Sequence, residues 1–433
     1  MTMSVSSAVS SPSATASSAS GEAFGMTCRF CDTPLHHTFV DLGLSPLCES
    51  FVPAAQVNDG EMFYPLHTFV CENCHLVQLD EFVSPEEIFT EYAYFSSYAD
   101  SWLEHSKRYV DAITKRLGLD ETSQVVELAS NDGYLLQYFV EKDIPALGVE
   151  PAENVAQVAI EKGIPTRVEF FLEETARQMV EEGIQADLVL GNNVLAQVPN
   201  LNSFVAGIKL LLKPGGVVTV EFPHLLQLME ENQFDTIYHE HFSYFSWISA
   251  EAIFAEHGLT LFDVEELPTH GGSLRIYARH DEDTTRPVTE RARELKEREL
   301  AYGLDDLSTY DLFAEQVRET KRKILDFLID AKRTGKTIAG YGAPGKGNTL
   351  LNYCGIRTDF LDYTVDRNPY KHGRYTPGTH IPIFAPDKIR ETKPDYVFIL
   401  PWNFKDEIME QMADIRDWGA RFVVPIPELT VID

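Results

Sequence analysis

The stretch "SQVVELASNDGYLLQYFVEKDIPALGVE", residues 123–150, decides the fold of the central part of this chain. A short apolar run over residues 125–128 leads into a polar turn that contains glycine. A helical segment follows, and then a second strand that ends in Glu150. This order is one β-α-β unit, which builds an open parallel sheet. Such sheets bind ligands at the carboxyl ends of their strands, so we expect a binding loop between Ala129 and Gly133.

The residues of this loop indicate the ligand. Glu150, an acid at the end of the second strand, can accept hydrogen bonds from both hydroxyls of a ribose, and Glu127 could hold an ammonium group through water. The loop lacks the GxGxxG pattern of diphosphate binding. A ribose and a zwitterionic tail without phosphate describe S-adenosylmethionine. We assign this cofactor to Glu127, Ala129, Asn131, Gly133, Glu150, Asn192 and Asn193.

The next elements continue the same sheet. The sequence "ADLVLGNNVLAQVPNLNSFVAGIKLLLKPGGVVTVEFPH" predicts a strand over 187–190, a helix, a turn at "KPGG" (213–216) and a strand over 217–222. Asn192 and Asn193 follow the first of these strands and would lie beside the cofactor. The spacing is typical of class I methyltransferases, and the alternative is another nucleotide-binding α/β domain.

A second α/β region follows charge-rich helices predicted from about Pro287 to Thr334, which would brace two domains. In "KTIAGYGAPGKGNTLLNYCGI", Gly340, Gly342 and Gly345 fit GxGxxG after a strand. A P-loop is disfavoured because Gly347 stands where Ser or Thr must bind Mg²⁺. The remaining interpretation is a glycine-rich turn that holds a diphosphate.

The charge of this region agrees with an anionic ligand. From residue 331 to the end, 14 lysines and arginines face 13 acids, whereas the whole chain has a net charge of -31. We assign a phosphorylated substrate to Gly342, Lys346, Asn348, Arg367, Lys371 and Arg374. The alternatives are a Rossmann-like domain that binds NAD or one that binds nothing.

Four of the six cysteines form two CxxC pairs, Cys28 with Cys31 and Cys71 with Cys74, which are separated by 39 residues. Two such pairs supply four thiolates, the complete set of a closed tetrahedral Zn²⁺ site. A closed site has no open position, so we expect the metal to support folding and not catalysis. The alternatives are redox-active pairs or buried cysteines without a metal.

Composition limits the partners of the chain. Its 433 residues are enough for two to four domains, and the net charge of -31 disfavours nucleic acid and anionic membranes. No apolar run is long enough to span a bilayer. We expect a cytoplasmic monomer or small homo-oligomer. The predicted parts are a disordered tail (1–25), a zinc-binding domain (26–85), a methyltransferase domain (86–285) and a C-terminal Rossmann-like domain (286–433).

The stretch "TIYHEHFSYFS", residues 236–246, gathers histidines, a glutamate and tyrosines. It could be a set of acid/base groups, a metal site at His239 and His241, or a polar aromatic strip over a core. The metal is the weaker interpretation because the two histidines are two residues apart and no third ligand is evident nearby.

The ordered motifs of residues 26–433 resemble one family. The two CxxC pairs, "EYAYFSSY", "ELASNDGYLL", "NNVLAQVPN", "EFPH", "YHEHFSYFS", "HGGSLRIY" and "GYGAPGKGNTLLNY" are similar to those of sugar C-methyltransferases, which act on nucleotide-linked ketosugars in deoxysugar biosynthesis, as in antibiotic pathways. Two positions depart from the family pattern. Ala129 replaces a glycine that many members carry, and Gln197 replaces a histidine.

The resemblance implies a fold and a function. It implies an N-terminal zinc-binding domain, a central S-adenosylmethionine domain and a C-terminal Rossmann-like domain, with a dTDP-sugar bound between domains. The expected reaction is methylation at C3 of a dTDP-4-keto-deoxysugar, with His241 as the base, Tyr238 as the donor to the ketone, Glu240 on the sugar and Tyr94 closing over it. The alternatives are a methyltransferase of another acceptor with an NAD-binding C-terminal domain, and a zinc-ribbon binding protein without activity.

Overall fold

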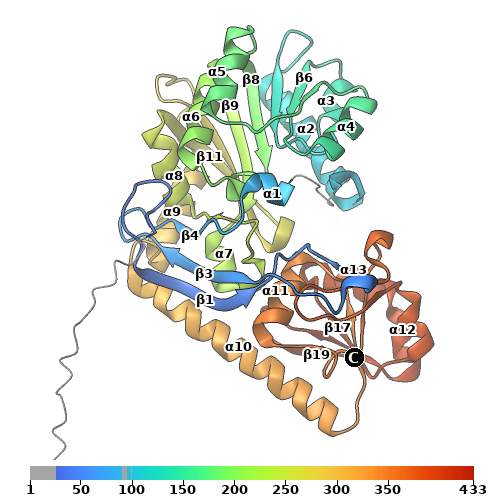
Figure 1. Cartoon of the computed structure of the whole chain (residues 1–433). Helices are drawn as coiled ribbons and strands as arrows, with labels where there is room; N and C mark the ends of the chain where they lie inside the picture. The colour runs from blue at the N-terminus through green and yellow to red at the C-terminus, as the bar shows by residue number, and fades with distance from the viewer. Residues whose placement is uncertain (1–25, 90–94, 99) are drawn as a thin grey trace, which may run out of the picture.

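The computed structural model describes residues 26–89, 95–98 and 100–433, which form three parts (Figure 1). The predicted tail (1–25) and Tyr94 lie outside these residues. Of the helices within the described ranges, none is both long and apolar enough to cross a membrane. The α/β class and the three-part architecture predicted from the sequence are confirmed.

The N-terminal part is an antiparallel sheet that borrows a strand from the middle of the chain. Strands β1 (His37–Ser45), β3 (Tyr64–Val70) and β4 (Val77–Leu79) are followed in the sheet by β10 (Ser243–Tyr244). A separate strand, β2 (Val52–Pro53), pairs with β15 (Arg374–Tyr375) of the C-terminal part. A short helix, α1 (Pro85–Phe89), follows. Both strand pairs therefore cross the predicted domain limits.

The central part is a seven-stranded sheet in the order β11-β12-β9-β8-β5-β6-β7. Strand β12 is antiparallel to both of its neighbours, β11 and β9. Every pair from β9 to β7 is parallel. The strands are β5 (Val125–Leu128), β6 (Ala146–Val149), β7 (Thr166–Arg167), β8 (Ala186–Asn192), β9 (Leu212–Pro223), β11 (Leu259–Leu267) and β12 (Ser273–His280). The helices are α2 (Asp100–Leu117), α3 (Gln137–Val140), α4 (Glu153–Glu161), α5 (Glu173–Glu181), α6 (Leu201–Leu211), α7 (Leu225–Glu230) and α8 (Trp247–Glu256).

The predicted "KPGG" turn lies inside a strand. Strand β9 begins at Leu212, and its pairing with β8 jumps from Leu212 to Val217 while β8 advances by two residues. Residues 213–216 therefore form a bulge, and Gly215 adopts a φ of 79° that a glycine tolerates best.

The C-terminal part is a sheet in the order β16-β14-β13-β17-β18-β19, of which only β19 is antiparallel. This is the predicted Rossmann-like arrangement. Its strands are β13 (Ile338–Tyr341), β14 (Thr364–Val365), β16 (Ile383–Phe384), β17 (Tyr396–Ile399), β18 (Arg421–Val424) and β19 (Thr430–Ile432). Its helices are α11 (Gly345–Cys354), α12 (Asp387–Thr392) and α13 (Lys405–Gln411).

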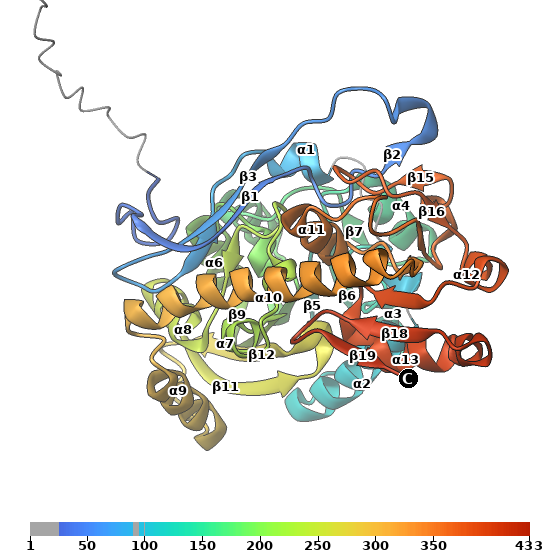
Figure 2. The same ribbon diagram turned by 90° about the horizontal axis from the view of Figure 1, so that it is seen from below.

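Two helices connect the central and C-terminal parts, as the charge-rich pattern predicted. Helix α9 (Glu290–Tyr302) ends at Gly303, whose left-handed φ of 94° turns the chain into α10 (Leu307–Arg333). Helix α9 packs on α8 and β11, whereas α10 lies along β1 and α11 (Figures 1 and 2). Helix α10 buries one face, with Phe313, Val317 and Ile324 fully enclosed. Each such side chain contributes about 1.5–3 kcal/mol through burial.

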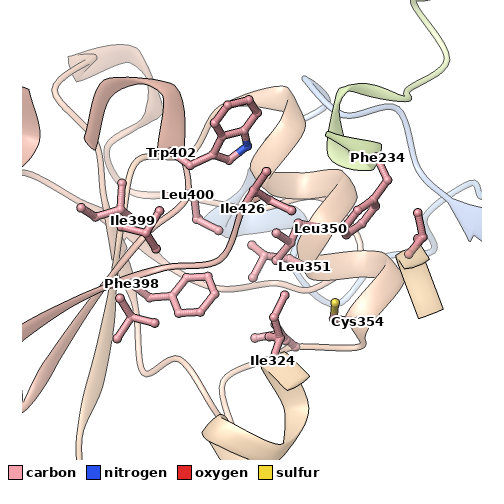
Figure 3. Packing of buried hydrophobic residues seen from close by; sticks show 14 of the residues in the cluster. Phe234, Ile324, Leu350, Leu351, Cys354, Phe398, Ile399, Leu400, Trp402 and Ile426 are labelled. Atoms are coloured by element: carbon pink, nitrogen blue, oxygen red, sulfur yellow. The ribbon is translucent and has the colours of Figure 1, made fainter. Parts of the chain in front are cut away.

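One hydrophobic core is shared by several parts of the chain. It contains residues of β1, β3, α10 and the C-terminal sheet, together with Phe234 and Ile237 from the segment before β10. Figure 3 shows Phe234 beside Leu350 of α11, and its ring lies 5.4 Å from that of Tyr353. The segment that carries the histidine cluster is therefore anchored in the C-terminal core.

A buried carboxylate ties α9 to the central part. Glu299 is 0% exposed and accepts hydrogen bonds from the backbone of Trp247 (2.7 Å) and Ile248 (2.9 Å), at the first turn of α8. Its Oε1 also lies 2.7 Å from Nε2 of His224. The carboxylate thus satisfies donors that a helix N-terminus leaves without partners.

We predict that Glu299→Ala lowers the free energy of unfolding by about 3–5 kcal/mol, because the substitution leaves a buried histidine and two backbone donors without their acceptor. Denaturant unfolding followed by tryptophan fluorescence measures the change. Glu297→Ala, on the exposed side of the same helix, is the matched control and should shift the transition very little. Equal stability of the two variants would contradict this role for Glu299.

Candidate active site in an interdomain cleft

The four paired cysteines converge at one end of the N-terminal sheet. The sulfurs of Cys28 and Cys74 lie 3.5 Å apart, as do those of Cys31 and Cys71. All four donor atoms lie within 4.8 Å of one another. A tetrahedral zinc site with Zn–S bonds of about 2.3 Å places its sulfurs about 3.8 Å apart, so the donor set fits this metal.

The two cysteine pairs have the same local structure. The residue after each pair, Asp32 or His75, has a left-handed φ of 57° or 56°, and its backbone N–H donates to the carbonyl of the first cysteine of the pair. Gln78 Nε2 and the backbone N–H of Asn73 donate to sulfurs of the cluster at 3.2 and 3.4 Å. Such donors support thiolates. Within the described ranges, no other group of cysteine, histidine or acidic side chains is arranged to hold a metal.

A cleft of about 1510 Å³ lies between the three parts. Its walls include the carboxyl ends of strands β5, β6 and β8, the segment before β10, and the N-terminus of α11. Of the predicted residues it is lined by Ala129, Asn131, Glu150, Asn192, Asn193, Tyr238, Glu240, His241, Lys346, Lys371 and Arg374. The chain therefore brings the predicted cofactor loop, histidine cluster and basic residues into one cavity.

The predicted cofactor loop forms one wall. Glu150 is held in place because its carboxylate accepts hydrogen bonds from the backbone of Asn131 and Ala152, both at 2.9 Å. Burial raises the pKa of Glu150 to about 7. Ala129 and Asn131 both adopt left-handed φ values, 55° and 50°. Glycine adopts this conformation most easily. The left-handed backbone at position 129 therefore also suits the glycine that many family members carry there.

Two asparagines at the end of β8 carry polar atoms that suit a ligand. Nδ2 of Asn192 and Oδ1 of Asn193 are buried and have no hydrogen-bond partner among the described residues. Buried polar groups are normally paired, so these atoms, with Glu150, fit a polar ligand in this half of the cleft. S-adenosylmethionine is the ligand that the sequence predicts at this position.

Glu127 and Gly133 lie behind the loop. Neither lines the cleft. Glu127 is 0% exposed, and burial raises its pKa well above the usual range against the opposing effect of Tyr134. At Gly133, a Cβ would lie 2.4 Å from Ile164, so this glycine is required for packing against the region after α4. Both residues stabilise the loop on the side that faces away from the cleft.

His241 and Tyr238 face each other within the cleft. Their ring centroids lie 4.2 Å apart. Burial, together with His270 and Lys346, lowers the pKa of His241 to about 3, while the carbonyl of Thr236 opposes the shift by accepting a hydrogen bond from the ring. The imidazole is therefore neutral at neutral pH, and a nitrogen that does not donate to Thr236 can accept a proton.

His239 points away from the cleft and supports the fold. Its Nε2 lies 3.1 Å from the carbonyl of Pro65, and its ring contacts Tyr64 and Phe82. The predicted weakness of a metal site at His239 and His241 agrees with this geometry, because the two side chains take separate roles.

Glu240 lies in a cluster of acidic character. Its Oε1 accepts a hydrogen bond from the thiol of Cys48 at 3.7 Å. Burial and the nearby Glu49 raise the pKa of Glu240 to about 8. At neutral pH the side chain is therefore mostly protonated and can donate a hydrogen bond.

Basic side chains of the C-terminal part form a second wall of the cleft. Nζ of Lys346 lies 2.9 Å from Oδ1 of Asn403 and 4.6 Å from the centre of the Trp402 ring. Lys371 donates to the carbonyl of Ala343 at 2.8 Å and lies 3.6 Å from Glu49. Arg374 is exposed. Three cations in a strongly acidic chain make this wall suited to an anionic ligand.

Three of the predicted substrate residues do not line the cleft. Arg367 is directed outward, where it pairs with Glu407 at 3.1 Å. Asn348 is buried and donates to the carbonyl of Cys48 at 2.6 Å. Gly342 packs against Pro401, which would lie 2.4 Å from an added Cβ. Asn348 and Gly342 therefore serve contacts within the fold, and Arg367 forms an ion pair on the surface.

The glycine-rich turn of the C-terminal part is covered by the chain itself. Cys48 Sγ and Glu49 Oε1 would lie 2.8 and 3.2 Å from a Cβ added at Gly345. Asp366, the acid that would hold a ribose in an NAD site, accepts hydrogen bonds from the backbone of Ala343 and Asn368, both at 2.8 Å, as Glu150 does in its own loop. The cover over Gly345 disfavours a dinucleotide at the turn.

Sequence reasoning left two groups of the cleft without a role. His270 lines the cavity beside Asn193, and Glu49 approaches Lys371 from the N-terminal part. The "HGGS" motif drew attention to His270 but did not predict its hydrogen-bond partner, Asn193. Glu49 had no local signal, because its place depends on strand pairing between β2 and β15.

Comparison with known proteins agrees with this arrangement. Family models match residues 28–89 ("Putative zinc binding domain"), 102–264 ("Methyltransferase domain") and 268–427 ("C-methyltransferase C-terminal domain"). The C-methyltransferase NovU of Streptomyces niveus is 35% identical over 408 residues, which is 94% of this chain and 96% of NovU. This chain belongs to the C-methyltransferase family.

Solved structures resemble part of this C-methyltransferase. The PH0226 protein of Pyrococcus horikoshii OT3 is 15% identical, with a TM-score of 0.36, and the match covers 47% of this chain and 99% of that one. Magnesium protoporphyrin IX methyltransferase of Synechocystis PCC 6803 is 13% identical, with a TM-score of 0.32, and covers 45% and 88%. The prediction of an S-adenosylmethionine-dependent methyltransferase is confirmed by the family to which the chain belongs.

We predict that the purified C-methyltransferase contains one zinc ion per chain, and that Cys71→Ser removes it and lowers the thermal midpoint, because three thiolates bind the metal less tightly than four. Elemental analysis and thermal unfolding measure both effects. Cys354→Ser replaces a buried cysteine outside the cluster and should leave the zinc content unchanged. Wild-type protein without zinc would contradict the assignment.

We predict that Glu150→Gln weakens binding of S-adenosylhomocysteine about 10- to 100-fold, because an ionised acceptor of hydrogen bonds is lost. Because the carboxylate form binds and its pKa is about 7, wild-type affinity should fall as the pH drops below 7, by up to about tenfold per pH unit. Isothermal titration calorimetry between pH 5.5 and 8.5 measures both effects. The control Glu153→Gln, on the exposed side of α4, should bind like the wild type. Equal affinity of the two variants would exclude Glu150 from the site.

Proposed function

We propose that this protein transfers a methyl group from S-adenosylmethionine to C3 of a dTDP-4-keto-deoxysugar. The observation that carries the proposal is the single cleft that the cofactor loop, the histidine cluster and the basic wall share. A methyl acceptor that is both a ketone and a nucleoside diphosphate needs these three features together. The cofactor supplies an electrophilic methyl group.

The acceptor carbon must lose a proton before it can attack. A carbon next to a ketone is acidic only if a base is close and the resulting enolate oxygen is stabilised. His241 is neutral and buried, so it can take this proton. The positive charge of Lys346 disfavours the protonated form of His241. The enolate that forms at the same time is an anion close by, and it favours the protonated imidazole.

Tyr238 and Glu240 would bind the sugar. Both line the cleft within three residues of the base. The hydroxyl of Tyr238 would donate to the ketone oxygen, where negative charge develops as the proton leaves. Glu240, held in its protonated form by burial and by Glu49, would donate to a sugar oxygen and would not repel the enolate. Tyr94 remains a candidate to close over the sugar.

The basic wall would bind the diphosphate. Lys371 and Arg374 line the cleft, and Lys346 lies near the histidines. The ammonium group of Lys371 lies 3.6 Å from the carboxylate of Glu49. Phosphate oxygens would compete with this carboxylate for Lys371. The covered glycine turn favours a nucleoside diphosphate held by side chains over NAD.

We predict that His241→Asn binds S-adenosylhomocysteine and dTDP as the wild type does but loses at least about 10³-fold in methyl transfer, because the proton acceptor is removed. The assay incubates enzyme, methyl-labelled S-adenosylmethionine and a panel of dTDP-ketosugars, and NMR locates the new carbon. Arg367→Ala, a basic residue outside the cleft, is the control and should retain full activity.

Three results would contradict parts of this proposal. Full turnover by His241→Asn would exclude this histidine as the base. Stabilisation of the protein by NAD in place of dTDP would favour a different C-terminal ligand. A methyl group found on an atom other than C3 would correct the position of transfer.

A further inference from the structure

His270 occupies the cleft with no role in the reaction described so far. Its Nε2 lies 3.1 Å from Nδ2 of Asn193, at the end of β8 on the cofactor side. His270 lines the same cleft as His241 and Lys346. It therefore stands on the cofactor side of the cavity that also holds the proposed base.

The backbone of His270 is held in an unusual conformation. Its φ of 55° and ψ of 18° are left-handed, which costs a residue other than glycine about 1–3 kcal/mol and persists only where the surroundings impose it. Gly271 follows with a φ of 91°, and its missing Cβ admits Trp402, which would lie 2.6 Å away. Strain of this kind is concentrated at functional sites.

Buried hydrogen bonds fix this turn from the side away from the cleft. The hydroxyl of Thr269 donates to Glu221 at 2.8 Å, and Gln233 donates to the carbonyl of Gly271 at 2.7 Å. Glu221 is 0% exposed and is itself bound by Arg275 (2.7 Å) and His105 (3.0 Å). These partners hold the pKa of Glu221 at about 2, so it stays an ionised and fixed acceptor.

The hydrogen bond with Asn193 defines the form of the imidazole. An amide Nδ2 can only donate, so Nε2 of His270 accepts and the proton of the neutral ring is on Nδ1. Among the described residues Nδ1 has no protein partner. The ring of Trp102 packs against the imidazole in a T-shaped arrangement, with the ring centroids 5.4 Å apart. A neutral imidazole in this form presents a single N–H donor that the protein does not use.

We propose that His270 is a second functional imidazole of the cleft, which donates a hydrogen bond from Nδ1 to the substrate oxygen that becomes the enolate. Glu221 acts as its positioning residue through Thr269. The inference rests on the proposed function, because it assigns a group to the ketone of that substrate. No proton is transferred: His241 takes the proton from carbon, and His270 stays neutral.

The charges around His270 keep it a donor. Burial and the Lys346 ammonium lower the pKa of His270 to about 4, against the raising effect of Glu221. Once His241 is protonated, its positive charge disfavours a second cation beside it. The two histidines therefore divide the work of base and donor and do not compete for one proton.

The test measures exchange of the C3 proton for deuterium in D₂O, with S-adenosylhomocysteine and a dTDP-4-ketosugar present, alongside methyl transfer. We expect His270→Asn to slow both by about 10²–10³-fold, since removal of one donor to an oxyanion has this effect. The KM of the sugar and the affinity for S-adenosylhomocysteine should change less than twofold. The control is His257→Asn, a half-buried histidine that does not line the cleft.

A second variant tests the positioning role. Thr269→Val keeps the volume of the side chain but removes its hydrogen bond to Glu221, and we expect about a tenfold loss in kcat and in exchange with an unchanged KM, whereas Thr269→Ser should restore both. The same rates in His270→Asn and wild type would overturn this inference alone. A wild-type enzyme that exchanges no proton of any dTDP-ketosugar would overturn the proposed function and this inference with it.

Discussion

The site depends on the burial of one segment, residues 234–246, among all three parts of the chain. Phe234 is enclosed in the C-terminal core, and the hydroxyl of Thr349 in α11 donates to the carbonyl of Ile237 at 3.1 Å. Further along, Phe242 donates its N–H to the carbonyl of Ala196 at 2.7 Å, and Ser243 pairs with Gln78 of the N-terminal sheet. His241 is thus held in place only when the three parts are assembled.

This constraint links the distant cysteine cluster to the chemistry. The second cysteine pair precedes β4 directly, and β4 is the strand to which β10 pairs. Gln78, within β4, also donates to Cys28. A metal that fixes the two cysteine pairs therefore also fixes strand β4, the strand to which the histidine segment pairs through β10. The four cysteines do not line the cleft, so a metal bound by them would act on the site only through this sheet.

Burial also sets the charge state of the cleft. It raises the pKa of Glu240 and lowers the pKa of His241, so both groups are mainly neutral before substrate enters. In such a site of low dielectric constant, the charge of an enolate interacts strongly with fixed donors and cations. Lys346, His241 and His270 line this cleft.

The sequence predicted the parts of the fold that depend on local order. The loop from 129 to 133, the acid at 150 and the two cysteine pairs are each defined by neighbours in the chain, and their positions agree with the structure. What depends on contacts between distant segments was missed. Gly342 and Asn348 matched a phosphate-binding pattern, yet Pro401 and the Cys48 carbonyl, far away in sequence, occupy the space beside them.

The most direct test of this account is a crystal structure with S-adenosylhomocysteine and a dTDP-ketosugar bound together. The account predicts both ligands in the one cleft, with the ring of His241 within about 4 Å of C3 and Lys371 on the diphosphate. A nucleotide bound elsewhere, or an imidazole at position 241 turned away from the sugar, would contradict it.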